Sequence, residues 1–127
     1  MKLFGDPLKI LLAEDDTVTQ TAMVKLLKKI GLSADVVGSG LEAINALQNR
    51  SYDVILMDVQ MPKMDGLETT KAIRDRWPYR NIKIIAVTSC TQKGDRETCI
   101  EAGMDDYIPK PAKREDIMAA LDLSHRC

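Results

Sequence analysis

The segment "ILMDVQMPKMDG", residues 55 to 66, begins with an apolar run that ends on an aspartate, Asp58. An apolar run of this kind is typical of a strand that is covered on both faces of a parallel sheet. An aspartate after a strand often does no more than accept backbone hydrogen bonds in the following turn. Whether Asp58 does more depends on the residues that follow the other strands.

The composition limits the classes of protein that this chain can belong to. Its 127 residues, 45% hydrophobic and 29% charged, predict one globular domain over residues 1–127 with a core from about residue 8 to residue 122. With 18 basic and 19 acidic residues, the chain lacks the basic excess of domains that bind nucleic acid directly. Its apolar stretches are too short to span a bilayer and "MKLFGDPLK" does not resemble a signal peptide, so we expect a cytoplasmic domain without membrane insertion.

The three cysteines do not form a metal-binding or disulfide pattern. They are odd in number and contain no CxxC pair. We therefore expect Cys90, Cys99 and Cys127 to be ordinary thiols.

Apolar runs alternate with helical patterns along the whole chain, which predicts five βα units. The expected strands are residues 9–13, 34–38, 53–57, 83–87 and 106–108. The expected helices are residues 17–30, 40–50, 67–77, 93–102 and 114–121. We predict an α/β fold, a flavodoxin-like doubly wound (βα)5 domain with a five-stranded parallel sheet in the order 2-1-3-4-5.

Helical spacing of apolar residues predicts which side chains face the sheet. The residues expected to point inward from the first, second and fifth helices are Val18, Ala22, Leu26, Ile30, Leu41, Ile44, Leu47, Ile117, Ala120 and Leu121.

Polar residues stand at the carboxyl end of four of the five strands: Glu14 and Asp15 after the first, Asp58 after the third, Thr88 after the fourth and Lys110 after the fifth. Right-handed crossovers bring these ends to one edge of the sheet, where such folds bind ligands. Three carboxylates this close need either protonation or a bound cation. The nearby lysine favours ionised carboxylates that hold a hard cation, Mg²⁺ or Mn²⁺.

A carboxylate next to a divalent cation and an ammonium group is able to attack a phosphoryl group, because the cations neutralise charge on the transferring oxygens. The hydroxyl of Thr88 could hold a further oxygen. Each residue also has an ordinary structural alternative: Thr88 as a capping hydroxyl, Lys110 as a solvated charge and Tyr107 as a half-buried edge aromatic.

Four segments, "KILLAEDD", "ILMDVQMPKMDG", "IIAVTS" and "DDYIPKP", together resemble the receiver domain of two-component response regulators. The resemblance implies that Asp58 is the phosphoacceptor and that Mg²⁺ is held by Glu14, Asp15, Asp58 and the backbone carbonyl of Gln60. Having Glu rather than Asp first in the acidic pair departs slightly from the commonest family pattern.

The same resemblance implies roles for three further residues. Thr88 becomes the switch hydroxyl, Lys110 the phosphate-facing lysine and Tyr107 the aromatic whose burial changes on activation. It also implies a cis peptide bond before Pro111.

The function implied is a phosphorylation-dependent signalling switch that catalyses only its own phosphorylation and slow dephosphorylation. His125 is the only histidine and no Gly-rich nucleotide loop is present, so the phosphoryl group must come from a partner histidine kinase or histidine phosphotransfer domain.

Two other functions share parts of this pattern. A phosphatase of the haloacid dehalogenase type would need an acid two residues after the nucleophile, where this chain has Gln60. A flavodoxin-like flavin site would place a phosphate in the loop "AEDDTVT", whose acids repel it.

The sequence leaves open whether the domain acts alone or belongs to a larger protein. Its motifs resemble receivers of hybrid histidine kinases more than those joined to DNA-binding domains, and a stand-alone regulator of the chemotaxis type is the alternative.

Four aspartates and three methionines are expected to be structural. The aspartates satisfy backbone donors at helix starts and turns, and the methionines fill the core or contact loops. These residues are Asp16, Asp65, Asp105, Asp106, Met57, Met61 and Met64.

Overall fold

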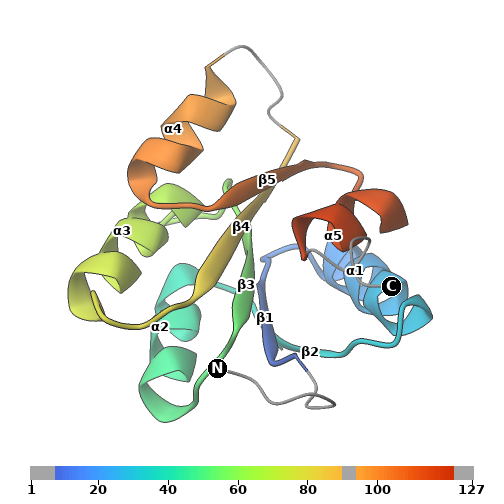
Figure 1. The fold of residues 1–127 in the computed structure, drawn as a ribbon, viewed down its shortest axis with the longest axis horizontal. Coiled ribbons are helices and arrows are strands. Elements are labelled where there is room, and N and C mark those ends of the chain that lie inside the picture. Colours follow the sequence, from blue (N-terminus) through green and yellow to red (C-terminus); the bar gives the residue numbers. More distant parts are fainter. Residues whose placement is uncertain (1–7, 90–93, 122–127) are drawn as a thin grey trace.

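Five parallel strands form the centre of the protein, in the order β2-β1-β3-β4-β5, with helices on both faces of the sheet (Figure 1). The structure is a computed structural model that describes residues 8–89 and 94–121. The strands are β1 (Ile10–Ala13), β2 (Ala34–Val37), β3 (Val54–Asp58), β4 (Lys83–Thr88) and β5 (Asp106–Pro109). The helices are α1 (Thr17–Lys29), α2 (Gly40–Asn49), α3 (Gly66–Arg76), α4 (Asp95–Ala102) and α5 (Arg114–Ala120). The predicted fold class and strand order are confirmed.

Two strand ends differ from the prediction in a way that matters for the site. Asp58 is the last residue of β3 and Thr88 the last residue of β4, whereas the sequence pattern predicts that each follows its strand. Asp58 pairs in register with Val87, and Thr88 pairs with Pro109. Both polar residues are therefore held by the sheet itself and not by a loop.

The core lies in two layers, one on each face of the sheet. Alternate residues of a strand point to opposite faces, so Leu11 and Ile55 enter the layer beneath α2, α3 and α4, whereas Leu12 and Leu56 enter the layer beneath α1 and α5. All residues of β1 and β3 are buried, as expected for central strands with helices on both sides.

The predicted inward face of α1 is wrong at its beginning. Val18 is 76% exposed and Ala22 is exposed, whereas Met23 and Leu27 are buried. A helix turns about 100° per residue, so positions spaced by four drift about 40° at each step and cannot remain on one face over three turns. The predicted row of apolar residues that starts at Val18 therefore begins on the solvent side of α1.

The other helix faces agree better with the prediction. In α2, Leu47 is buried as expected, but Leu41 is 62% exposed and Ala43 takes the inward position. At α5 the predicted side chains are all buried: Ile117, Ala120 and Leu121.

Some sequence predictions fall partly outside the described residues. Helix α4 begins at Asp95, and Lys93, where we expected it to begin, is not described. Cys90, Cys127 and His125 also lie outside the described residues, whereas Cys99 is buried on α4.

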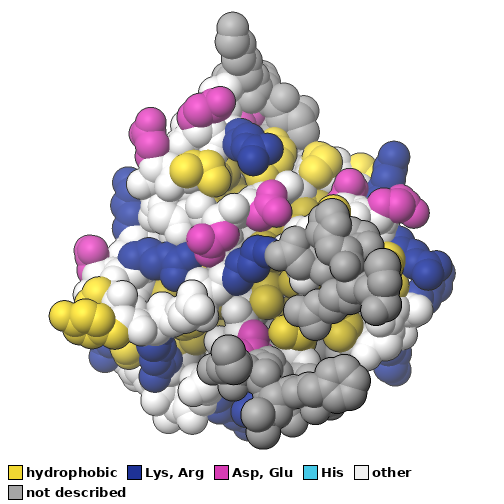
Figure 2. All heavy atoms as spheres, viewed as in Figure 1, with side chains coloured by type: hydrophobic (Ala, Val, Ile, Leu, Met, Phe, Trp, Pro, Cys, Tyr) yellow, Lys and Arg dark blue, Asp and Glu magenta, His cyan; other side chains and the backbone are white. Residues whose placement is uncertain are grey.

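No helix within residues 8–89 and 94–121 has the length and apolar character needed to cross a membrane. Over the face shown in Figure 2, Lys and Arg side chains are interspersed with Asp and Glu. The absence of direct nucleic-acid binding remains a prediction.

Candidate functional site

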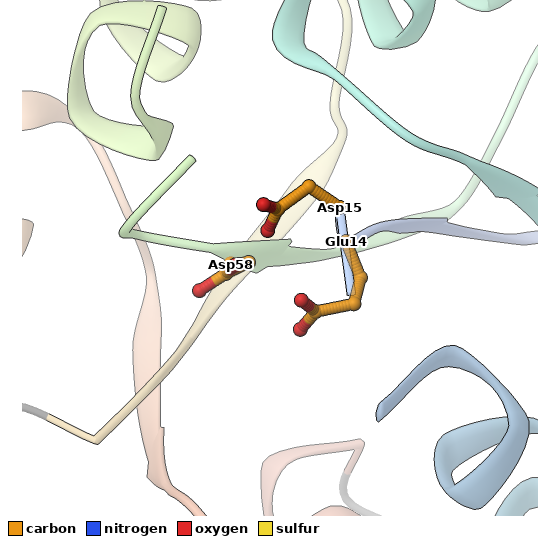
Figure 3. Close-up of side chains that lie close together, drawn as sticks. All are labelled: Glu14, Asp15 and Asp58. Carbon is orange, nitrogen blue, oxygen red and sulfur yellow. The ribbon is translucent and has the colours of Figure 1, made fainter. Parts of the chain in front are cut away.

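Three carboxylates meet at the carboxyl edge of the sheet, as the sequence predicted. Glu14 and Asp15 follow β1, Asp58 ends the adjacent β3, and Figure 3 shows the three side chains close together at the ends of these strands. One carboxylate oxygen from each residue lies within 4.8 Å of the other two.

The three carboxylates differ in exposure. Glu14 and Asp58 are only 2% and 3% exposed, whereas Asp15 is exposed. The cluster therefore has a buried floor and an open side.

Lys110 joins the cluster from the end of β5. Its ammonium Nζ lies 2.9 Å from Oε1 of Glu14 and 3.2 Å from Oδ1 of Asp58. Its own backbone N–H donates to the carbonyl of Thr88 at 2.8 Å, which fixes the lysine to the end of β4. The peptide bond between Lys110 and Pro111 is cis, as the resemblance implied. The lysine is thus an internal counterion and not a solvated surface charge.

The site holds more negative charge than Lys110 can neutralise. Burial, and then the charge of Glu14, raise the pKa of Asp58 from its ordinary value of 3.8 to about 6. Burial acts to lower the pKa of Lys110, but the hydrogen bond to Glu14 and the charges of both carboxylates outweigh it and raise that pKa. Ionised Asp58 is therefore under electrostatic strain that a further positive charge would relieve.

Two donors hold Glu14, one in α1 and one directly before it, and neither is predicted from the sequence. The side-chain amide of Gln20 donates to the Glu14 carbonyl at 2.6 Å, and the Asp16 N–H donates to Glu14 Oε2 at 3.1 Å. Gln20 lies one turn into the helix that follows the acidic end of β1, and this position is the sequence signal that could have indicated its role. Glu14 is thus held at its backbone carbonyl and at Oε2, while Lys110 contacts Oε1.

The residues to which the family resemblance assigns further roles lie on β4, on β5 and directly after β3. Thr88 is buried at the end of β4, the strand next to Asp58, and Tyr107 is half-buried against the core beneath α3 and α4. The Gln60 N–H donates to Asp58 Oδ1 at 3.2 Å. The switch roles of Thr88 and Tyr107, and metal ligation by the Gln60 carbonyl, remain predictions.

The four aspartates assigned to structural roles each accept a backbone hydrogen bond. The donor amides belong to Thr19, Glu68, Ile84 and Tyr107, and the acceptors are Asp16, Asp65, Asp105 and Asp106. Asp16 lies close to the metal-ligand candidates, but hydrogen bonds from Thr19 lower its pKa and it serves as the N-cap of α1. Met57 and Met61 are buried in the core as predicted.

The donor set fits a hard divalent cation. Three carboxylates against one ammonium leave a formal surplus of negative charge, and carboxylate oxygens are the ligands that Mg²⁺ and Mn²⁺ prefer. The exposed Asp15 leaves the open side for a cation with its waters.

Comparison with known proteins gives consistent matches over nearly the whole chain. The family model for the response regulator receiver domain matches residues 10–122. Hybrid signal transduction histidine kinase K of Dictyostelium discoideum is 37% identical over 126 residues, which cover 94% of this chain and 10% of that protein. The chain therefore spans about a tenth of the length of this relative, and the resemblance to receivers of hybrid kinases is confirmed.

Two solved structures are informative neighbours. One is the receiver domain of sensor histidine kinase PA1611 from Pseudomonas aeruginosa PAO1, solved with a magnesium ion coordinated in the active site cleft. It is 38% identical to this chain with a TM-score of 0.83, and the match covers 93% of this chain and 97% of that one. The receiver domain in the complex of Saccharomyces cerevisiae Ypd1, a histidine phosphotransfer protein, with its downstream response regulator Ssk1 is 25% identical. Its TM-score is 0.79 and the match covers 94% of both chains. Together with the family match over residues 10–122, the fold and the acidic cluster establish that this chain belongs to the response regulator receiver domain family of two-component signalling.

Proposed function

We propose that this chain is a phosphorylation-dependent switch in which Asp58 accepts a phosphoryl group from a phosphohistidine of a partner protein. The observation that carries the proposal is the placement of Asp58. It is buried at the end of β3, close to the carboxylates of Glu14 and Asp15, with its Oδ1 3.2 Å from the ammonium of Lys110. Membership of the receiver family favours this function over a phosphatase or a flavin site.

The transfer step needs a nucleophile and nearby positive charge. A carboxylate oxygen of Asp58 attacks the phosphorus, the phosphorus–nitrogen bond breaks, and the imidazole nitrogen of the donor keeps the electron pair, which leaves an acyl phosphate on Asp58. Lys110 offsets the charge of the phosphoryl oxygens, and the hydroxyl of Thr88 donates to one of them. Strand β3 supplies the rigidity that keeps the nucleophile in line.

Glu14, Asp15, Asp58 and the backbone carbonyl of Gln60 would hold Mg²⁺ or Mn²⁺. When bound, the cation supplies positive charge that neutralises the transferring oxygens. Support comes from the fit of the donor set and from the magnesium ion in the cleft of the related PA1611 receiver domain.

The acyl phosphate on Asp58 is hydrolysed slowly by the domain itself, which does not hydrolyse phosphoesters of other molecules. Water attacks the phosphorus and the bond to the Asp58 oxygen breaks, which releases inorganic phosphate and regenerates the carboxylate. The side chain of Gln60 stands where a phosphatase of the haloacid dehalogenase type has its general acid, and an amide cannot shuttle a proton near neutral pH. The chain therefore catalyses only its own phosphorylation and dephosphorylation.

The output is a change of the partner-binding face. A phosphoryl group adds roughly −1.5 to −2 charge, which draws Thr88 and Lys110 toward Asp58 and shifts Tyr107. Helix α4 is the element that we expect to move: its N-cap Gly94 makes no side-chain cap, and of its residues only Cys99 and Ala102 are buried.

The partners are a histidine kinase or a histidine phosphotransfer domain. The Ypd1–Ssk1 complex is a receiver of the same fold bound to a histidine phosphotransfer protein, and the relative in Dictyostelium discoideum is a hybrid kinase. We favour a receiver that belongs to a hybrid kinase. A kinase core in the same reading frame of the parent gene would support this, and its absence would favour a stand-alone regulator.

The test is phosphorylation by acetyl phosphate in millimolar Mg²⁺, followed by mass spectrometry of the intact protein. We expect one added phosphoryl group in the wild type and in the control Asp75→Asn, which changes an exposed carboxylate of α3, and none in Asp58→Asn. EDTA should abolish the reaction. Equal phosphorylation of Asp58→Asn would show that the phosphoacceptor is a different residue.

Amide chemical shifts test the switch. On phosphorylation we expect the amides of Thr88, Tyr107 and the first turn of α4 to shift, whereas those of the α2 carboxyl end, away from the site, stay fixed. Unchanged shifts at Thr88 and α4 in fully phosphorylated protein would contradict the conformational part of the proposal.

A further inference from the structure

The first turn of α3 lies directly on the backbone of Asp58. Gly66 begins this helix, and a Cβ placed on it would lie 2.4 Å from the Asp58 carbonyl oxygen and 2.8 Å from the Val59 Cα. Carbon atoms do not approach backbone atoms so closely without displacing them. Gly66 does not have a positive φ, so the reason for glycine here is space and not backbone conformation.

A hydrogen bond fixes the same contact. The Gly66 N–H donates to the Val59 carbonyl at 2.8 Å. One residue further, the Gln60 N–H donates to Oδ1 of Asp58 at 3.2 Å. A continuous path therefore runs from the start of α3, through the peptides after Asp58, to the carboxylate that we assign as phosphoacceptor.

The first turn of α3 is itself held by a reciprocal cap. Oδ1 of Asp65 accepts from the Glu68 N–H at 2.9 Å, and Oε1 of Glu68 accepts from the Asp65 N–H at 3.2 Å. Such a capping box satisfies two backbone donors and keeps the first turn from fraying. Gly66 lies between these two residues, so its position relative to Asp58 is fixed from the helix side as well.

We propose that Gly66 is a positioning residue for Asp58: the capped first turn of α3 presses on the Asp58–Val59 peptide through a residue without a side chain and so sets the direction of the carboxylate. This inference rests on the proposed function of Asp58. A methyl group at position 66 would push residues 58–60 and the helix apart by part of an ångström or more. Displacement of a reacting group by about 1 Å costs about 10²-fold in rate.

The main experiment compares Gly66→Ala with Gly38→Ala, because a Cβ at Gly38 would make only an ordinary contact, 3.5 Å from the side chain of Glu42. With acetyl phosphate and saturating Mg²⁺, we expect Gly66→Ala to lower the maximal phosphorylation rate by about 10²-fold. The donor concentration for half-maximal rate should change little, because the nucleophile is displaced and the donor is not. Gly38→Ala should keep the wild-type rate.

A second measurement does not depend on the metal or on the reaction. In EDTA, we expect the amide resonances of Asp58, Val59 and Gln60 to shift in Gly66→Ala, and the amide of residue 66 to lose its protection from hydrogen exchange. A role limited to global stability would leave these local signals unchanged. The inference is overturned if Gly66→Ala is folded, phosphorylates at the wild-type rate and leaves the amides of residues 58–60 in place.

A cap series decides the question if Gly66→Ala does not fold. Asp65→Ala removes the N-cap of α3, and Asp65→Ser keeps a capping oxygen there. Ser39→Ala removes the equivalent N-cap of α2, where Ser39 Oγ accepts from the Glu42 N–H at 3.2 Å. We expect Asp65→Ala to lower the maximal rate by about threefold to tenfold, and the other two to keep it. An equal loss in Ser39→Ala would overturn the inference.

The proposed function and this inference fail separately. If the wild type takes no phosphoryl group on Asp58, the proposed function is wrong, and the metal-free amide signals then decide alone whether Gly66 positions residues 58–60. If the wild type is phosphorylated and Gly66→Ala matches it in rate and in amide signals, only the inference is wrong.

Discussion

Replacing Asp58 by asparagine should stabilise the metal-free domain at neutral pH, although it removes a group central to the proposed function. Burial and the charge of Glu14 raise the pKa of Asp58 from 3.8 to about 6 in the folded protein. In the unfolded chain the carboxyl ionises at its ordinary value. Ionised Asp58 therefore costs folding free energy, and an uncharged isostere removes that cost.

The size of the effect follows from the two pKa values. The difference between 3.8 and about 6, at about 1.4 kcal/mol per pH unit, corresponds to about 3 kcal/mol. Because the folded-state pKa is the higher one, the folded protein binds more protons between these values, and wild-type stability falls as the pH rises from about 4 to about 6. The favourable contact of Lys110 with Asp58 is already included, since it acts on the same pKa.

The assay is urea unfolding in EDTA, followed by circular dichroism, at pH 7.5 and pH 4.0. At pH 7.5 we expect Asp58→Asn to raise the free energy of unfolding by about 3 kcal/mol, which at a slope of about 2 kcal/mol/M moves the midpoint by about 1.5 M. At pH 4.0 the two proteins should differ little. The control Asp75→Asn changes an exposed carboxylate of α3 and should stay within about 0.5 kcal/mol of the wild type.

Binding of Mg²⁺ should relieve the electrostatic strain on ionised Asp58. A cation bound only by the folded wild type stabilises it by mass action, so millimolar Mg²⁺ should narrow the gap between wild type and Asp58→Asn at pH 7.5. If Asp58→Asn is as stable as the wild type, or less stable, at pH 7.5 in EDTA, then ionised Asp58 is not under electrostatic strain and the argument is refuted.

Three further predictions follow from the site and the core. Mg²⁺ at about one hundred times its dissociation constant should raise wild-type stability by about 2.7 kcal/mol; a thermal melt should show the shift, and Asp15→Asn should lose most of it. Removing the ammonium that contacts both buried carboxylates, in Lys110→Ala, should slow phosphorylation by acetyl phosphate by about 10²-fold, whereas Lys113→Ala, at an exposed lysine, should keep the wild-type time course. In urea unfolding, Val18→Ser on the exposed side of α1 should change the free energy of unfolding by less than about 0.5 kcal/mol, whereas Leu27→Ala on the buried side should lower it by about 2 to 5 kcal/mol. A large loss of stability in Val18→Ser would show that Val18 is buried, as the sequence pattern predicts.

The sequence by itself was sufficient for the fold and for the composition of the site. Apolar strand patterns alternating with helical ones predicted five βα units, and the rule that crossovers are right-handed placed the carboxyl ends of all strands on one edge. Because local pattern and topology agree, the sequence alone predicts that Glu14, Asp15 and Asp58 lie together, and the structure confirms this.

Tertiary structure decided which face of each helix is buried. In α1, two sets of apolar residues have helical spacing: the predicted set that starts at Val18, and the pair Met23 and Leu27. Only packing against β1 and β3 decides that Met23 and Leu27 are the buried ones. Periodicity fixes the spacing of a face but not its rotation about the helix axis, which depends on where the helix enters the sheet edge. Val18, one residue after the start of α1, lies on the solvent side for this reason.

Tertiary structure also decided the contacts that give the site its geometry. Lys110 and Glu14 are almost a hundred residues apart in the chain, and no local pattern states that their charged atoms meet at 2.9 Å. No pattern in the sequence assigns a role to Gly66, yet the space it leaves is taken up by the backbone of Asp58. Residue type and spacing determine which groups reach the sheet edge, whereas the distances between them depend on how strands and helices pack, because those distances are set by contacts between segments remote in the chain.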